Sequence, residues 1–280
     1  MMTLVKRLIP SPLKQKIRKF RNYSANKNKA RIFGALAPLV PGVEDMFDGP
    51  PSLGEFKRNG EEFLKIYKEI CGLLPDEKML DVGCGIGRKT LPLTQYLNEG
   101  AVYEGIDITK AGIDWCREKF TPRFPNFHFQ QIDVYNKHYN PCGKYQPSEY
   151  KFPFADESFS FAMLGSVFTH MLPDDLENYL SEIYRVLKRG GRCLISYFLL
   201  NEESLRLIEA GDSTIDLRYV FDKYRTASRE VPEQAIAFDE GWIRDLYRRL
   251  GLKVMHLDYG SWCGRKDYLS YQDLILGVKE

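Results

Sequence analysis

The sequence lacks several features that would assign the chain to a specialised class of protein. Its 280 residues contain six cysteines, none of them in a C-x-x-C pair, and four scattered histidines. This spacing does not suit a disulfide framework or a zinc site, so we expect no bound metal. There is also no apolar run of about 18 residues and no secretory signal at the N-terminus. We therefore expect a cytoplasmic protein.

Acidic residues are absent from the first 43 residues, which hold ten of the 40 Lys and Arg. The rest of the chain then holds 30 basic and 38 acidic residues, a net charge of −8. Such a body does not suit a polyanionic partner, so we expect no nucleic acid. Two readings of residues 1–31 stay open, because apolar residues alternate with the positive charges there. The arm either contacts an anionic membrane surface or packs, partly solvated, on the body.

The chain from residue 60 onward alternates strand-like and helix-like patterns, at an ordinary globular composition of 44% hydrophobic residues. After a first helix near 63–70, the patterns predict strands at 79–82, 102–107, 127–133, 159–164 and 193–199. Helices are expected between them at 88–97, 111–120 and 176–187, the last one ended by Gly190-Gly191. Such alternation favours a parallel sheet covered on both faces.

Two further strands are expected at the C-terminus, at 252–259 and 271–279, after a helix at 240–250. No helix separates these strands, so they can only pair antiparallel. The predicted fold class is α/β: a Rossmann-like, doubly wound, seven-stranded sheet, mostly parallel, with an antiparallel C-terminal hairpin. Residues 34–59, rich in Gly and Pro, are interpreted as linker. We therefore divide the chain into an arm and linker (1–59) and one domain (60–280).

A glycine-rich turn follows the first strand of the domain. It reads Gly83-Cys84-Gly85-Ile86-Gly87, with Asp81 two residues before the first glycine. Ligands of doubly wound sheets bind at such turns, where glycine lets the backbone come close to them. A dinucleotide fingerprint would need glycine at position 88, where the chain has Arg88. We interpret Cys84 as a spacer rather than a nucleophile.

Two further carboxylates stand at strand ends. Asp107 ends the second strand, where it could accept hydrogen bonds from ribose hydroxyls, and Asp133 ends the third, where it could accept one from an adenine amine. Each also has a structural reading: a surface acid for Asp107, a turn-forming residue for Asp133, and a cap on the loop amides for Asp81.

The segments MLDVGCGIGR, YEGIDITKAGIDWC, FHFQQIDVYN, FPFADESFSFAMLGSVFTHM and RVLKRGGRCLISYF together resemble the successive motifs of class I S-adenosylmethionine-dependent methyltransferases. The resemblance covers about residues 60–200. It implies S-adenosylmethionine as cofactor, with its methionine part on the glycine loop and its ribose at Asp107. It also implies Ile108 beside the adenine, Asp133 and Val134 at the adenine edge, and Gly165-Ser166 near the sulfonium. The implied cofactor residues are thus Asp81, Gly83, Cys84, Gly85, Gly87, Asp107, Ile108, Asp133, Val134, Gly165 and Ser166.

The acceptor side of the reaction is less constrained. His170, just beyond the fourth strand, is the candidate general base, and its alternative role is to begin or pack against the next helix. Insertions near 135–152 and 200–238 are candidate covers for the substrate. We expect a small polar acceptor, methylated at oxygen, with sugars, glycans and lipid-linked groups all left open. A nicotinamide-dependent oxidoreductase and a non-catalytic cofactor-binding protein are the alternatives.

Overall fold

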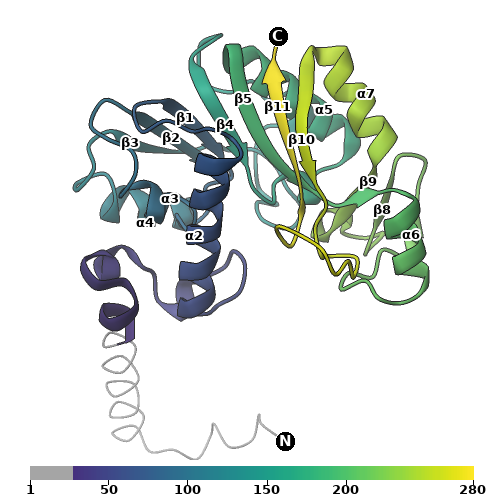
Figure 1. Cartoon of the computed structure of the whole chain (residues 1–280), viewed down its shortest axis with the longest axis horizontal. Helices are drawn as coiled ribbons and strands as arrows, with labels where there is room; N and C mark the ends of the chain where they lie inside the picture. The colour runs from purple at the N-terminus through teal and green to yellow at the C-terminus, as the bar shows by residue number, and fades with distance from the viewer. Residues whose placement is uncertain (1–27) are drawn as a thin grey trace, which may run out of the picture.

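Seven strands form the main sheet of the protein, in the order β10-β11-β5-β4-β1-β2-β3 (Figure 1). A computed structural model describes residues 28–280, so residues 1–27, most of the basic arm, lie outside the described residues. The strands are β1 (Lys78–Val82), β2 (Val102–Asp107), β3 (Phe127–Gln131), β4 (Phe159–Leu164), β5 (Leu187–Tyr197), β10 (Leu252–Asp258) and β11 (Asp273–Lys279).

The topology confirms the Rossmann-like fold class. Strands β1 to β5 pair in parallel, and the strand order reverses between β1 and β4. Strand β11 is antiparallel to both of its neighbours, β10 and β5. The C-terminal hairpin is therefore present, and its last strand lies inside the sheet while β10 forms the edge.

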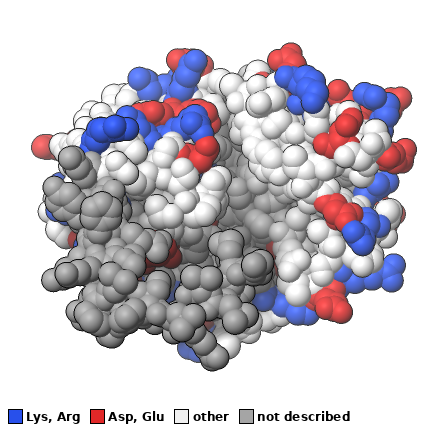
Figure 2. Space-filling model, turned by 90° about the horizontal axis from the view of Figure 1, so that it is seen from below, with Lys and Arg blue, Asp and Glu red and all other residues white. Residues whose placement is uncertain are grey.

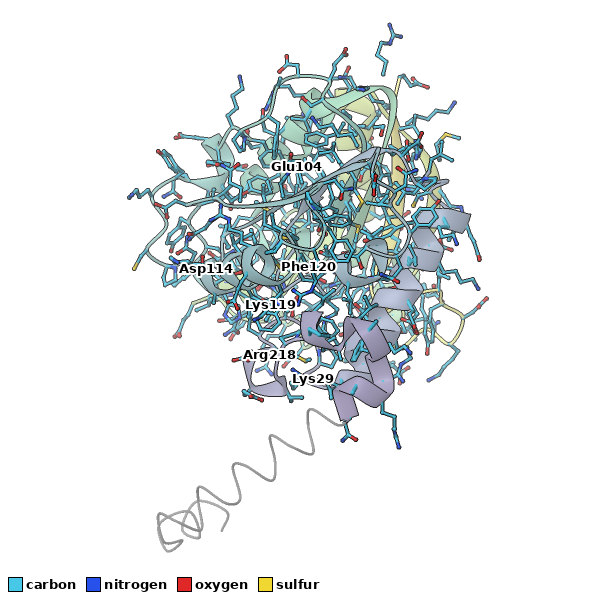
Figure 3. All side chains as sticks on the ribbon, turned by 90° about the vertical axis from the view of Figure 1, so that its left-hand side faces the viewer. Lys29, Glu104, Asp114, Lys119, Phe120 and Arg218 are labelled. Atoms are coloured by element: carbon cyan, nitrogen blue, oxygen red, sulfur yellow. The ribbon has the colours of Figure 1, made fainter. Side chains whose placement is uncertain are left out.

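Helices cover both faces of this sheet. α2 (Leu53–Glu69), α3 (Thr90–Leu93) and α4 (Lys110–Lys119) share one core with Met79 of β1, whereas α5 (Pro173–Val186) and α7 (Glu240–Leu250) share another with Leu80. The alternation of Met79 and Leu80 between the two cores is the period of two that a strand buried on both faces requires. On α4, Asp114 and Lys119 lie on the outer surface, while Phe120, directly after the helix, is fully buried (Figure 3).

The chain between β5 and α7 builds a second, smaller sheet in the order β6-β9-β8-β7. Its elements are β6 (Leu199–Leu200), α6 (Glu202–Glu209), β7 (Tyr219–Val220), β8 (Tyr224–Thr226) and β9 (Ile236–Asp239). This sheet accounts for the insertion near 200–238. Short 3-10 helices complete the fold: η2 (Gly34–Leu39), η3 (Val43–Asp45), η4 (Pro147–Glu149), η5 (Phe168–His170) and η6 (Pro232–Gln234).

Three local predictions were wrong. The linker expected at 34–59 already contains the start of α2, whose apolar face includes Phe56. The helix expected at 88–97 is shorter at both ends, since α3 spans only Thr90–Leu93. It cannot begin at Arg88 in a regular way, because Pro92 has no N–H to donate to the Arg88 carbonyl. Gly190-Gly191 does not cap α5. That helix ends at Val186. Gly190, at φ +73°, instead lies within β5, in the part where the pairing with β4 shifts register.

No helix within residues 28–280 is both long and apolar enough to cross a bilayer. No group of three or more His, Cys, Asp or Glu side chains in the same residues is placed to hold a metal ion.

Candidate functional site

The glycine loop leaves β1 at the edge of the sheet where the parallel strands end. Gly83, Gly85 and Gly87 have φ values of +77°, +55° and +82°, a conformation that residues with a Cβ adopt only at a cost. A Cβ on Gly87 would also lie 2.9 Å from the ring of Phe120. The loop thus depends on its glycines.

Asp107 joins this loop to the end of β2. One carboxylate oxygen accepts a bond from the N–H of Gly85 at 2.7 Å, and the other accepts from the N–H and hydroxyl of Thr109 at 2.7 and 2.6 Å. Burial raises the pKa of Asp107, and the bonds from Thr109 and Gly85 oppose that rise. The carboxylate is therefore held in one orientation beside the loop, while its remaining lone pairs can accept further bonds.

Asp81 and Cys84 are both buried under the loop. Asp81 accepts a bond from the Tyr103 hydroxyl at 2.7 Å, so its observed partner is a side chain and not a loop amide. Burial raises the pKa of Asp81 to about 6, against the hydrogen bond from Tyr103 and the charge of Lys89. Burial also raises the pKa of the Cys84 thiol well above its usual range, which fits a spacer and not a nucleophile.

The predicted adenine side is more open. The side chain of Asp133 is 40% exposed, and its Oδ2 lies 3.3 Å from Nζ of Lys144. Val134 is buried and forms an isolated bridge with Tyr145, and Ile108 is half-buried next to Asp107. These three residues lie beyond β2 and β3 at the same edge of the sheet, where a flat, half-polar ring could be held.

Gly165 and Ser166 follow β4, the strand on the other side of the loop. Ser166 has φ +66°, an unusual conformation for a residue with a Cβ. Its N–H donates to Oγ of Ser196 at 2.7 Å, and both hydroxyls donate to Oε1 of Gln272, at 2.9 Å from Ser166 and 2.6 Å from Ser196. Local strain of this kind is common at ligand sites. Gln272 lies 106 residues further along the chain, so its place beside Ser166 could not be predicted from adjacent residues.

His170 lies in a small cluster of aromatic side chains. Its Nδ1 is 2.7 Å from the carbonyl oxygen of Glu233, which can only accept, so Nδ1 carries the proton and Nε2 the lone pair. The ring is stacked on His138 at 6.4 Å and meets Tyr139 edge-on at 5.2 Å between centroids. Burial lowers the pKa of His170, which favours the neutral form.

A group of charged residues around the loop was not predicted from the sequence. Arg88, only 3% exposed, donates to the backbone carbonyl of Asp48 and pairs with its Oδ1 at 3.3 Å. The carboxylate of Asp48 in turn lies against Gly85, and the ammonium of Lys89 lies against Gly165. The segment before α2 therefore reaches the site. Figure 2 views this side of the molecule and shows, among the described residues, a furrow bordered largely by uncharged side chains.

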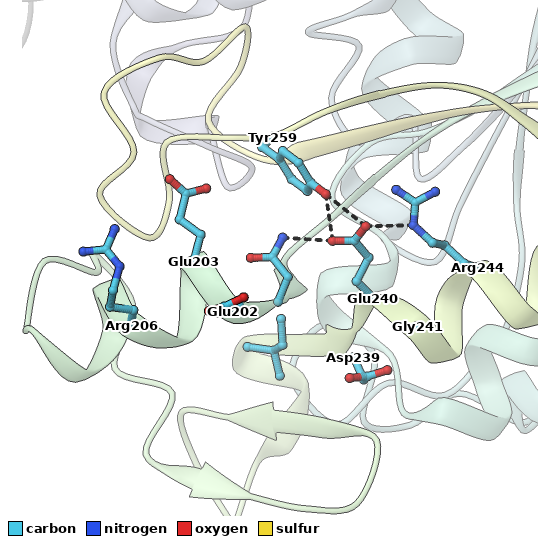
Figure 4. A pocket seen from close by; sticks show the side chains of 10 residues that line it. Glu202, Glu203, Arg206, Asp239, Glu240, Gly241, Arg244 and Tyr259 are labelled. Atoms are coloured by element: carbon cyan, nitrogen blue, oxygen red, sulfur yellow. Dashed lines mark hydrogen bonds and ion pairs between the residues drawn. The ribbon is translucent and has the colours of Figure 1, made fainter.

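A separate hollow lies between the N-termini of α6 and α7 (Figure 4). Its central carboxylate, Glu240, accepts bonds from Asn201 at 2.9 Å, Arg244 at 2.8 Å and Tyr259 at 2.9 and 3.0 Å. These polar groups satisfy one another, and the hollow shares no residue with the glycine loop. We therefore place the candidate site at the loop.

Comparison with known proteins agrees with this choice. Residues 80–195 match the family model described as a methyltransferase domain. A phthiotriol/phenolphthiotriol dimycocerosates methyltransferase of Mycobacterium tuberculosis is 32% identical over 118 residues, which is 42% of this chain and 36% of that protein. The chain thus spans just over a third of the length of this curated relative.

Two solved structures share the fold. The PH0226 protein from Pyrococcus horikoshii aligns with a TM-score of 0.54 and 18% identity, over 81% of this chain and 92% of that one. Magnesium protoporphyrin IX methyltransferase from Synechocystis, solved with bound SAH, aligns with a TM-score of 0.52 and 16% identity, over 95% of this chain and 100% of that one. At such identities the likeness concerns the fold alone.

Proposed function

We propose that this chain, which belongs to the class I S-adenosylmethionine-dependent methyltransferase family, transfers a methyl group from that cofactor to a small polar acceptor. The observation that carries the proposal is the bond between the Gly85 N–H and Asp107 at 2.7 Å. This bond joins the glycine loop to a carboxylate suited to a ribose, at the point where the strand order reverses. A methionine part and a nucleoside part would thus find matching groups side by side.

The residues at this edge fit the cofactor in both shape and donor set. Three loop residues at positive φ are glycines, without side chains. The carboxylate of Asp107 ends β2, and that of Asp133 lies just beyond β3. When bound, the cofactor supplies an activated methyl group on sulfur with a good leaving group already in place. The protein then needs mainly to hold the acceptor in line with that methyl, which can correspond to effective molarities of about 10⁵ M or more.

An oxygen acceptor also needs to lose its proton, and we assign this step to His170. The proton on Nδ1 is held by the Glu233 carbonyl, so Nε2 is the atom able to accept a proton from an acceptor hydroxyl. General base catalysis of this kind contributes roughly 10²- to 10⁴-fold. Tyr139 and His138, packed around His170, together with the second sheet, would cover a polar acceptor.

Titration of the full chain with S-adenosylhomocysteine and with NAD tests the cofactor assignment. We expect binding of S-adenosylhomocysteine and none of NAD, because the loop lacks the third glycine of a dinucleotide fingerprint. Binding of NAD alone would overturn the proposal. An activity screen with the labelled methyl donor and hydroxylated metabolites, nucleotide sugars and lipid-linked sugars would then identify the acceptor. Cofactor binding without transfer to any of them would favour the non-catalytic alternative.

Contact between the basic arm and an anionic membrane stays a prediction, since residues 1–27 lie outside the described residues. Flotation of the full chain with anionic and neutral vesicles tests it. An arm that contacts the membrane would bring the chain to the top only with anionic vesicles, and less so at high salt. Recovery unchanged by deletion of the arm would show that it is not an anchor.

A further inference from the structure

Two charged side chains that the cofactor motifs do not account for border the glycine loop. Oδ2 of Asp48 lies 2.5 Å from the position that a Cβ on Gly85 would take, and Nζ of Lys89 lies 2.5 Å from the corresponding position at Gly165. These glycines follow β1 and β4, the two adjacent strands at which the strand order reverses. One negative and one positive group therefore face the crevice where the cofactor is proposed to bind.

Lys89 is a half-buried cation without a close counter-ion among the described residues. Its ammonium lies 5.0 Å from the centroid of the Phe63 ring, and no carboxylate within residues 28–280 comes within ion-pairing distance of it. Burial lowers the pKa of Lys89, and the more distant charges of Asp81 and Asp48 oppose this. A charge held in this way is costly to the free protein, and an anion that entered the crevice would relieve that cost.

Asp48 is held in place by the buried guanidinium of Arg88. Arg88 donates to the carbonyl of Asp48 and to that of Pro50, the latter at 3.4 Å, and lies 4.7 Å from the centroid of Phe56. The pair between Arg88 and Oδ1 of Asp48 leaves Oδ2 turned toward Gly85. The carboxylate is thus oriented before any ligand arrives, which lowers the entropic cost of ligand binding.

We propose that Lys89 and Asp48 bind the amino-acid end of the cofactor, Lys89 pairing with its carboxylate and Asp48 with its ammonium group. This inference rests on the proposed function, because it takes the cofactor as given. A zwitterion requires one group of each sign, and the crevice offers these two beside the loop, while Asp107 serves the nucleoside. The otherwise unexplained Arg88 then acts as a positioning residue for Asp48.

Ligand truncation combined with substitution tests the proposal by calorimetry on the full chain. S-adenosylhomocysteine keeps the amino-acid end, whereas 5′-methylthioadenosine lacks it. Lys89→Met and Asp48→Asn should each weaken the affinity for S-adenosylhomocysteine by about tenfold or more, which is the effect of losing one charge-assisted hydrogen bond. Both variants should bind 5′-methylthioadenosine within about twofold of wild type, which would also show that they are folded.

Matched controls are Lys110→Met and Asp45→Asn, which remove exposed charges on α4 and η3 and should change neither affinity. Equal losses for both ligands would mean that the two residues only support the fold of the site, and unchanged affinity for both would mean that they do not contact the ligand. Either result would overturn the inference and leave the proposed function standing. Failure of the wild-type chain to bind either ligand would overturn both.

Discussion

The missing side chain of Gly85 is the smallest feature on which the proposed site depends. A Cβ there would project into the crevice and lie 2.5 Å from the Asp48 carboxylate. We expect Gly85→Ala to remain folded, with a loss of roughly 1 kcal/mol from its φ of +55°, and to lose most of its affinity for S-adenosylhomocysteine. Thermal denaturation and calorimetry measure the two effects separately.

Gly72 provides the matched control for that experiment. Its φ is +61°, close to that of Gly85, but nothing lies within 4 Å of a Cβ placed on it. Gly72→Ala should therefore have a similar cost in stability and bind the ligand as wild type does. Similar affinity losses in both variants would show that backbone strain, not a blocked crevice, reduces binding.

The neutral form of His170 is the second feature at this scale. Burial lowers its pKa from the ordinary value near 6.5, so the ring accepts a proton throughout the neutral range. We expect kcat/KM to be flat above pH 6.5 and to fall only in more acidic solution, as His170 becomes protonated. His170→Ala should reduce turnover by about tenfold or more and remove that acidic limb, with cofactor affinity unchanged.

The control for His170 is His256, which is exposed on β10 and far in sequence from the site. His256→Ala should leave both the rate and its pH profile unchanged. If His170→Ala kept the acidic limb, another group would have to be the base, and His138, whose ring is stacked on His170, would be the next residue to test.

Residues of the site differ in how well the sequence predicts them. Asp107 and the glycines occupy positions that a strand end and a turn dictate, and the structure brings them together. Asp48 lies in an irregular segment without a motif, so only the folded chain reveals that Arg88 brings it to Gly85. The reason is physical. The conformation of a turn or strand end depends on adjacent residues and can be predicted from them, whereas an ion pair between distant segments depends on the whole fold.

The start of β11 depends on Asp273, a fully buried carboxylate. It accepts bonds from the N–H groups of Leu199 and Gly260, both at 2.6 Å, from the Trp262 indole at 2.7 Å, and from Arg265 at 3.2 Å. Asp273→Ala would leave the buried donors of Leu199, Gly260 and Trp262 unpaired, and Arg265 would keep only Glu203 as a counter-ion. We expect a loss of about 3–5 kcal/mol in the free energy of unfolding, measured with denaturant.

Asp245 is the comparison for this element. It forms an exposed pair with Arg248 within α7, and Asp245→Ala should change stability by no more than about 0.5 kcal/mol. A small loss in Asp273→Ala would mean that the loop between β10 and β11 rearranges to satisfy the donors, and that the carboxylate is not what fixes the hairpin.

Helices and strands with a clear period of apolar residues were predictable from the sequence. Elements whose bounds depend on contacts with distant residues were not. β2 and β4 begin and end where the apolar alternation predicts, and α7 ends at Gly251 as expected. α2 was cut short in the prediction because Gly54 follows Pro50 and Pro51 in a segment rich in Gly and Pro. A Cβ on Gly60 would lie 2.8 Å from the Arg88 carbonyl, so glycine there allows close packing rather than a break in the helix.

At the scale of the whole molecule, the site is assembled from segments that are far apart in the chain. The segment before α2, the glycine loop, the end of β2, and the turn after β4 meet at one edge of the main sheet (Figure 1). The second sheet, which follows β5, adds η6, whose Glu233 carbonyl orients His170. Binding of a single ligand should therefore stabilise all of these segments together.

Hydrogen exchange with and without S-adenosylhomocysteine tests this assembly. We expect added protection from exchange at residues 46–50, 83–89, 107–109 and 165–170. We expect none around Glu240, because its carboxylate is already bonded to neighbouring side chains. At a ligand concentration of 100 Kd the native state gains about 2.7 kcal/mol, so the melting temperature should rise by about 5–10 °C. Protection that included the glycine loop but not residues 46–50 would separate the segment around Asp48 from the site, whereas protection around Glu240 would mean that the ligand binds at the other hollow.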